Sequence, residues 1–258
     1  MQSPKRAWLV LALFFFSGAT ALVYEVVWSK FLSQMFGSTI YAQTAVLAAF
    51  MGGLALGNKL FGRWADRALR PVRAYGLLEI AIGLYAFLFP LLDRAADHLF
   101  ITVGSGIVEH AGWLLLLKGV LAAALLLGPT ILMGGTLPLM AAWLQKSTDD
   151  PGRRSARFYS VNSLGAVCGA ALAGFFLVQH FGMIATLYLT ATVNIVIGLA
   201  AMLIGRDQQS EVSDQTSDLR PPTSDLRPLT SDLRPLTSAP APSVRWPGLI
   251  VADRKSVV

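Results

Sequence analysis

The chain has 258 residues, of which 54% are hydrophobic and 14% are charged, and its mean hydropathy is +0.57. Soluble domains carry about a quarter charged residues, so this composition excludes an ordinary soluble enzyme and indicates a membrane protein. The net charge of +6 is explained by basic loops, so we expect a lipid bilayer, and not nucleic acid, as the partner.

Six windows of the sequence are long and apolar enough to cross a bilayer, because a helix crosses the hydrocarbon core in about 20 residues. In chain order they are residues 7–29, 31–58, 74–92, 119–145, 158–179 and 183–205. Four of them contain no Asp, Glu, Lys or Arg, whereas the first contains Glu25 and the third contains Glu79. The predicted fold class is therefore all-α, a polytopic membrane protein with six transmembrane helices over residues 1–205.

Basic residues alternate between the predicted loops and so indicate the orientation of the helices. They gather before the first window, between the second and third, between the fourth and fifth, and after the sixth: Lys5, Arg6, Arg63, Arg67, Arg70, Arg73, Lys146, Arg153, Arg154, Arg157 and Arg206. The positive-inside rule assigns these loops to the cytoplasm. We therefore predict a multi-pass protein of the cell (inner) membrane with both termini cytoplasmic.

Five tryptophans lie at predicted helix ends: Trp8, Trp28, Trp64, Trp113 and Trp143. Indole rings favour the headgroup region of a bilayer, so we expect these side chains to form an aromatic belt at the two interfaces.

Small residues recur every four positions in two of the windows. Ala49, Gly53 and Gly57 form one stripe, and Gly165, Gly169 and Ala173 form the other. Such stripes let helix backbones approach closely in lipid. We interpret them as packing faces within one subunit, and a homo-oligomer through the same faces is the alternative.

The fourth window contains the breaker residues Gly128, Pro129, Gly134, Gly135 and Pro138. Proline removes a backbone donor and clashes with the preceding turn, so this helix is predicted to be kinked or locally unwound. Broken helices at membrane depth often line substrate sites, which makes these residues a candidate site. A kink that serves only packing is the alternative.

Two carboxylates lie within the windows, at different depths. The first helix runs outward, which places Glu25 about 27 Å from its inner end, whereas Glu79 lies about 8 Å into its own helix. The two side chains are thus expected in opposite leaflets, where they cannot share a proton. We predict two ion pairs instead, Glu25 with Lys118 and Glu79 with Lys59. The alternative is that each charged side chain reaches the nearer interface by itself.

After residue 205 the chain becomes polar and rich in proline. The segments "TSDLRPP", "TSDLRPL" and "TSDLRPL" run in tandem over residues 216–236. The proline in each copy excludes a coiled coil, and the repeat is too short and too polar to bury a core. Residues 206–258 are therefore predicted to be a disordered linker or tail.

Three segments together resemble the membrane half of a known family. "SGATALVYEVVWSK" begins a segment that runs from 17 to 67, "GPTILMGGTLPLM" covers 128–140, and "FYSVNSLGAVCGAALAGFFLVQHFG" covers 158–182. They resemble the fused major-facilitator-like and spermidine synthase-like membrane proteins, a polyamine aminopropyltransferase family, over roughly residues 8–205. The resemblance implies that a cytoplasmic Rossmann-like domain follows the helices and transfers an aminopropyl group from decarboxylated S-adenosylmethionine to a diamine.

The catalytic half that the resemblance implies has no counterpart in this sequence. No strand with a Gly-rich turn and an acidic ribose-binding residue follows residue 205, and the single cysteine, Cys168, gives no thiol metal site. We therefore expect no catalytic, cofactor-binding or metal-binding residue here, and no aminopropyltransferase activity from this chain alone. A truncated or frameshifted family member is the expectation, and a stand-alone membrane protein stays open.

The turn between the second and third windows favours a second function class. The segment "GRWADRALRPVR" contains Gly62, Asp66 and Arg67 in a G-x-x-x-D-R pattern, which resembles the cytoplasmic turn of major-facilitator carriers. Six helices would be half of such a carrier, so the alternative function is a half-size transporter that acts as a dimer. A basic loop in which Asp66 pairs locally would explain the same residues.

Overall fold

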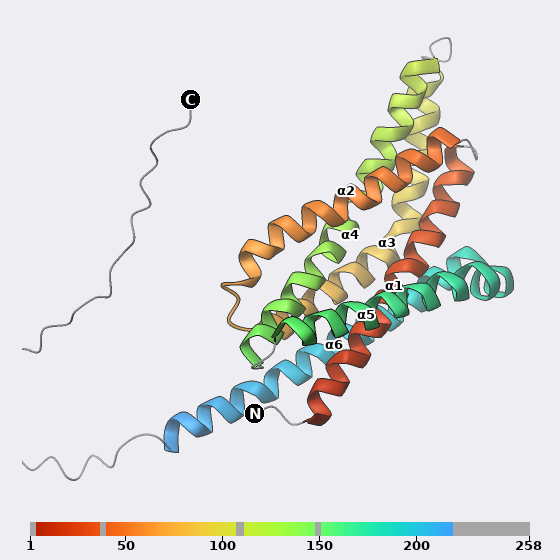
Figure 1. Ribbon diagram of the computed structural model, residues 1–258. Coiled ribbons are helices and arrows are strands. Elements are labelled where there is room, and N and C mark those ends of the chain that lie inside the picture. The colour runs from red at the N-terminus through yellow and green to blue at the C-terminus, as the bar shows by residue number, and fades with distance from the viewer. Residues whose placement is uncertain (1–3, 37–39, 107–110, 148–150, 219–258) are drawn as a thin grey trace, which may run out of the picture. The chain divides into compact units, whose positions relative to one another are not determined.

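The computed structural model describes residues 4–36, 40–106, 111–147 and 151–218, and every regular element among them is a helix (Figure 1). The helices are α1 (Pro4–Phe36), α2 (Ile40–Ala65), α3 (Pro71–Gly104), α4 (Ala111–Ser147), α5 (Pro151–Leu172), the π-helix η1 (Ala173–Leu177) and α6 (Val178–Asp218). The chain divides into two units, residues 1–215 and 216–258, and the bundle described below belongs to the first. The all-α prediction is confirmed for the described residues.

Five stretches of the bundle are long and apolar enough to cross a membrane. They are Ala7–Gln34, Gln43–Ala65, Pro71–Gly104, Gly112–Gln145 and Ser155–Arg206. The first four correspond to one predicted window each, whereas the fifth has 52 residues and covers the last two windows. The prediction of a polytopic membrane protein is therefore supported in its coarse form.

The long fifth stretch changes direction at one residue. Gly182 has φ 77° and ψ 173° and lies inside α6, with helical residues on both sides of it. A positive φ is strained for residues with a Cβ and is readily adopted by glycine. Beyond this residue α6 runs back in the general direction opposite to α5 (Figure 1). The boundary between the last two predicted windows falls at this position.

Helix ends extend beyond several predicted windows. α4 begins at Ala111, so Lys118 lies inside the helix and not at its start. The predicted domain boundary at Gly205 falls inside α6, which continues to Asp218. Residues 219–258, which hold most of the tandem repeats, lie outside the described residues.

Small residues bring the helix backbones together in pairs. A Cβ on Gly57 would overlap the carbonyl oxygen of Ile131 in α4, and a Cβ on Gly165 would overlap that of Phe15 in α1. Neighbouring glycines make equally close approaches: Gly53 to Thr130, Gly169 to Ala19, and Gly134 to Leu54. Both predicted stripes therefore make close contacts within the chain.

A cluster of aromatic rings fills the bundle beside α1 and α3. Trp28 stacks between Tyr24 and Phe89, with ring centroids 4.9 Å and 5.2 Å apart. The expected tryptophan belt is therefore wrong for Trp28, which is 0% exposed, and also for the buried Trp143. Their apolar helix faces continue past the predicted helix ends, so these indoles pack inside the protein. Trp8, Trp64 and Trp113 are exposed as predicted.

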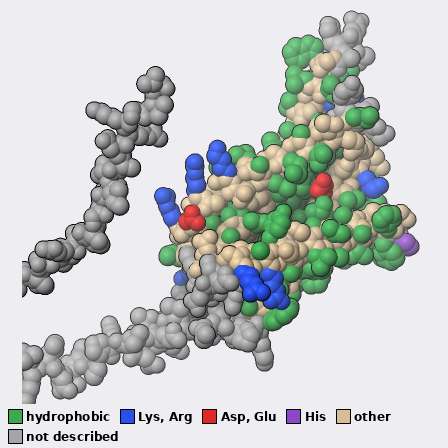
Figure 2. Space-filling view, in the orientation of Figure 1, with side chains coloured by type: hydrophobic (Ala, Val, Ile, Leu, Met, Phe, Trp, Pro, Cys, Tyr) green, Lys and Arg blue, Asp and Glu red, His purple; other side chains and the backbone are tan. Residues whose placement is uncertain are grey.

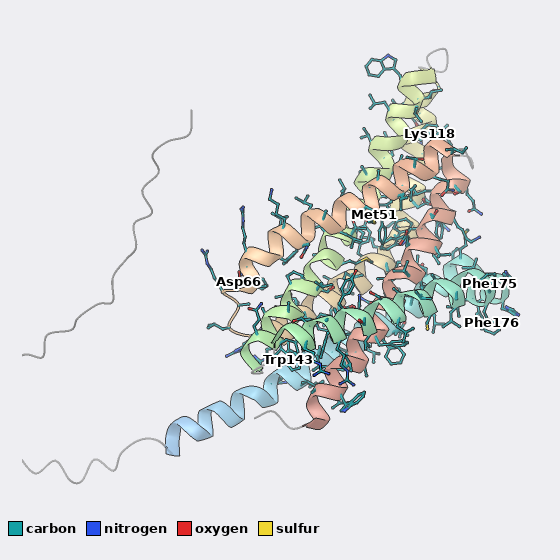
Figure 3. The ribbon with its side chains drawn as sticks, viewed as in Figure 1. Met51, Asp66, Lys118, Trp143, Phe175 and Phe176 are labelled. Atoms are coloured by element: carbon teal, nitrogen blue, oxygen red, sulfur yellow. The ribbon has the colours of Figure 1, made fainter. Side chains whose placement is uncertain are left out.

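Charged side chains gather at one end of the bundle. Figure 2 shows Lys and Arg side chains around the end of α2, while hydrophobic side chains cover much of the visible face. Figure 3 places Asp66 at this end and Lys118 towards the opposite end.

Candidate functional site

A cavity of about 450 Å³ lies between the helices of the bundle. Each of α1 to α6 contributes at least one lining residue. The polar side chains that line it are Ser17, Thr20, Asn58, Glu79, Thr136, Tyr159, Asn162 and Asn194. Its volume lies in the range of about 300–1,000 Å³ that is usual for small-molecule sites.

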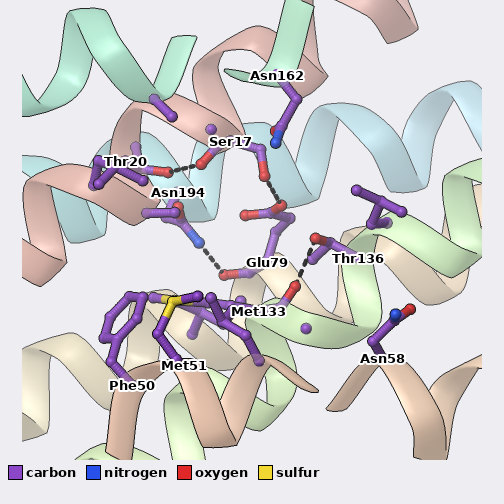
Figure 4. A pocket seen from close by; sticks show the side chains of 18 of the residues that line it. Ser17, Thr20, Phe50, Met51, Asn58, Glu79, Met133, Thr136, Asn162 and Asn194 are labelled. Atoms are coloured by element: carbon purple, nitrogen blue, oxygen red, sulfur yellow. Dashed lines mark hydrogen bonds between the residues drawn. The ribbon is translucent and has the colours of Figure 1, made fainter. Parts of the chain in front are cut away.

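Glu79 is the carboxyl-bearing residue of this cavity and lies deep in the bundle. It is 1% exposed, and its carboxylate accepts a hydrogen bond of 2.5 Å from the hydroxyl of Ser17. The side-chain amide of Asn194 in α6 donates to the backbone carbonyl of Glu79 at 2.8 Å. Figure 4 shows these two hydrogen bonds, which connect α1, α3 and α6 at one point. The carboxyl group of Glu79 is therefore held from α1, and its backbone is held from α6.

Two lining hydroxyl groups are satisfied by their own helices. Thr20 donates to the carbonyl of Ser17 at 3.0 Å, and Thr136 donates to the carbonyl of Met133 at 2.8 Å. Such local hydrogen bonds let a hydroxyl lie on a membrane helix without a partner from another helix. By contrast, the side chains of Asn58, Tyr159 and Asn162 have no hydrogen bond to any residue in the described part of the chain.

Apolar side chains form much of the remaining wall. Phe50, Met51 and Leu54 of α2, Ile82 of α3, and Met133 and Leu137 of α4 line the cavity. In Figure 4, Phe50, Met51 and Asn58 lie on one side, and Ser17 and Asn162 lie on the other. The cavity thus combines one carboxylate, several neutral polar groups and an apolar wall.

One of the five breaker residues of α4, Gly134, lines this cavity. α4 stays helical from Ala111 to Ser147, so it is not locally unwound at these residues, and the kink stays a prediction. Because Pro129 has no N–H, the carbonyl of Leu125 lacks a helical donor, and the Tyr85 hydroxyl donates to it at 2.7 Å. This side-chain donor explains how the helix continues through the proline.

Pro138 has a different consequence, because the carbonyl that it affects belongs to Gly134. Gly134 lines the cavity, and residue 138 supplies no backbone N–H to its carbonyl oxygen. Of the five breaker residues, Gly134 is the one that lines the cavity. A Cβ on Gly135 would meet the side chains of Phe61 and Leu78, and a Cβ on Gly128 would lie near the ring of Tyr85.

The residues of the two predicted ion pairs lie in different surroundings. Glu79 is buried and lies about 12 Å from the start of α3, compared with the predicted distance of about 8 Å. Lys59 is exposed and follows the lining residue Asn58. Glu25 is half-buried and does not line the cavity, and Lys118 lies over the ring of Phe100 at 5.6 Å. Both pairings stay predictions.

The G-x-x-x-D-R turn is well away from the cavity lining. α2 ends at Ala65, and the backbone N–H of Arg67 donates to the carbonyl of Trp64 at 3.1 Å. Asp66 and Arg67 are both exposed, and Gly62 has open space where a Cβ would be. The carrier-like interpretation of this turn stays a prediction.

Sequence reasoning missed most of the polar lining. Ser17, Asn58, Asn162 and Asn194 are single uncharged polar residues in apolar windows, and none was singled out. The signal that could have found them is the rarity of amide side chains in membrane helices, where each needs a partner or water.

Comparison with known proteins gives a family and three relatives. The family model described as Major Facilitator Superfamily matches residues 9–252. Polyamine aminopropyltransferase 2 of Streptomyces coelicolor is 30% identical over 198 residues, which are 76% of this chain and 34% of that protein. Polyamine aminopropyltransferase 1 of the same organism is 25% identical over 199 residues, again 76% of this chain and 34% of the relative.

The third relative, Polyamine aminopropyltransferase of Corynebacterium efficiens, is 27% identical over 205 residues, which are 77% of this chain and 35% of that protein. The chain thus spans about a third of the length of the curated relatives that it matches. No solved structure matches the chain.

Proposed function

Because the chain belongs to the Major Facilitator Superfamily, we propose that it is the membrane module of a polyamine aminopropyltransferase-like protein and that its cavity binds and passes a small solute. The observation that carries this proposal is the cavity itself. It is lined from all six α-helices and contains a buried carboxylate, an arrangement that packing alone does not require. An intramembrane ionisable residue is by default a sign of a functional site.

The proposal includes six passes in the inner membrane with both ends of residues 1–205 on the cytoplasmic side. The fifth apolar stretch has 52 residues, about 78 Å of helix, which is far more than one crossing needs. The reversal at Gly182 divides it into two lengths that each suffice. A phosphatase reporter fused after Arg206 is expected to be inactive, and a cytoplasmic reporter at the same place active. The opposite pattern would refute this topology.

A bulky side chain in the cavity is expected to block the solute. Ala55 is exposed and lines the cavity, so in Ala55→Phe the new ring can enter the cavity without displacing packed neighbours. We expect uptake of labelled putrescine into vesicles containing the purified protein to fall at least about tenfold. A loss of about 1.4 kcal/mol in binding already corresponds to that factor.

The matched control is Ala48→Phe, since Ala48 is an exposed residue of the same helix that does not line the cavity. Uptake by this variant is expected to equal that of the unmodified protein. Equal uptake by the two variants, or uptake no faster than in protein-free vesicles, would count against the proposal.

A half-size carrier that acts as a dimer is the second candidate. It is favoured by the exposed G-x-x-x-D-R turn and by the exposed lining residues Met51, Leu137 and Tyr159, which leave one side of the cavity open. The particle mass in mild detergent separates the candidates, because a dimer supports the half-size carrier and a monomer supports the fused-protein module.

A further inference from the structure

The charge of the cavity selects the sign of its ligand. Glu79 is the single Asp or Glu among the lining residues, and no Lys, Arg or His lines the cavity within the described part of the chain. A buried carboxylate is costly unless a positive charge or a proton balances it. The Ser17 hydroxyl that donates to this carboxylate is neutral. A cationic ligand would supply the missing charge.

A metal ion does not fit this set of groups. Calcium takes about six to eight oxygen ligands and magnesium about six in octahedral geometry, with more than one carboxylate in most protein-built sites. The cavity offers one carboxylate, and the described residues contain no group of three His, Cys, Asp or Glu that could hold a metal. Calcium and magnesium are therefore poor ligands for this cavity, and an organic cation is the candidate that the remaining groups can test.

The acceptors around Glu79 match a primary ammonium group, which has three N–H donors and no acceptor. Besides Ser17, the side chains of Tyr75 and Asn194 interact with this carboxylate, and its two oxygens keep acceptor capacity for a ligand beyond these contacts. Gly134 in α4 also lines the cavity, and its carbonyl lacks its helical donor because of Pro138. An acceptor without its helical donor is therefore present in a lining residue of α4.

The apolar wall accounts for the remainder of the ligand. Phe50, Leu54 and Ile82 offer hydrocarbon surface close to a single charged group. A second positive charge inside the cavity would have no carboxylate to balance it. The cavity therefore accommodates one charged end and an alkyl chain, and a second charged end would have to reach the open side near Asn58.

From these observations we infer that the cavity recognises one primary ammonium group carried on an unbranched alkyl chain, with Glu79 as its counter-ion. The inference rests on the proposed function, because it names the ligand class of the same cavity. It has a consequence that the names of the relatives do not contain: a monoamine binds at least as well as a diamine of equal chain length.

The test uses the full chain with Cys168→Ala and Ala55→Cys, so that the single thiol lies in the cavity. Reaction of this introduced thiol with a methanethiosulfonate reagent shows whether the cavity is accessible. A ligand that slows this reaction protects the thiol and therefore occupies the cavity. We expect n-butylamine to give half-maximal protection at a concentration no higher than the one that putrescine needs. 1-Butanol and butyrate are expected to need at least about tenfold higher concentrations. From ethylamine to n-butylamine, affinity is expected to rise about fourfold per methylene.

Substitution at the carboxylate tests the role of Glu79 directly. In Glu79→Gln, protection by n-butylamine is expected to weaken about tenfold to hundredfold, because a charge-assisted hydrogen bond is lost. Glu79→Asp keeps the charge and is expected to recover part of the binding. Glu25→Gln is the matched control, since Glu25 lies in α1 outside the cavity lining, and it should leave protection unchanged.

The outcomes separate the two proposals. If the introduced thiol reacts and is protected by butyrate or 1-butanol as well as by n-butylamine, the ammonium assignment is wrong and a solute-binding cavity remains. The same conclusion follows if n-butylamine protects the Glu79→Gln and Glu79→Asp variants as well as it protects the parent. If the introduced thiol does not react at all in the empty protein, the cavity is closed to solutes and the proposed function fails.

Discussion

Replacing Trp28 by alanine is expected to lower the free energy of unfolding by about 3 kcal/mol, measured by denaturation in detergent micelles. Trp28 is 0% exposed and stacks on Tyr24 and Phe89. Large-to-small changes at buried aromatic residues cost about 3–5 kcal/mol in soluble proteins. The lower end applies here, because lipid or detergent surrounds the ring in the unfolded state and the loss is mainly of packing.

Two comparisons make this prediction sharper. The indole nitrogen of Trp28 has no hydrogen-bond partner among the described residues, so Trp28→Phe removes no hydrogen bond and should cost less than half as much as alanine. Trp113 is 62% exposed, and Trp113→Ala should stay within about 0.5 kcal/mol of the unmodified protein. Equal losses from Trp28→Ala and Trp113→Ala would show that the aromatic cluster does not hold the bundle together.

Replacing Gly165 by valine is expected to cost about 3 kcal/mol, at the upper end of the usual range for overpacking. The new Cβ would overlap the carbonyl oxygen of Phe15, which is backbone and cannot turn aside as a flexible side chain can. α1 and α5 would therefore have to move apart along their whole contact, where Gly169 approaches Ala19 in the same way. Thermal unfolding in detergent measures the effect.

Gly152 provides the control for Gly165, because it lies in the same helix and has nothing within 4 Å of where a Cβ would be. Helix propensity alone slightly favours valine over glycine, so Gly152→Val should be neutral or weakly stabilising. A similar loss for both variants would mean that helix conformation, and not the α1–α5 contact, limits stability.

The apolar windows predicted the coarse fold well. A helix needs a long apolar stretch to cross a bilayer, and hydropathy along the sequence detects such stretches. The stripes containing Gly57 and Gly165 were also predictable, since a four-residue spacing places their members on one helix face. The distance of Glu79 from the start of its helix is longer than predicted, because the third window begins at residue 74 and α3 begins at Pro71.

The surroundings of Glu79 could not be predicted from the sequence. Its partners Ser17 and Asn194 lie in α1 and α6, and which helices meet at α3 is decided by packing between helices far apart in the chain. The same limit explains Trp28, which a window average assigned to an interface. Hydropathy gives the length of a helix, but it does not tell which of its faces will meet lipid and which will meet another helix.

The reversal at Gly182 bears on how the protein is made. No Lys, Arg, Asp or Glu occurs from residue 158 to residue 205, so in the proposed topology no such charge beside the turn can hold it on the external side during synthesis. The signals that orient this part of the chain lie at its two ends, at Arg157 and Arg206. With one non-helical residue between its two halves, the proposed six-pass topology implies that residues 158–205 leave the translocon together as one helical hairpin, in which each half orients the other.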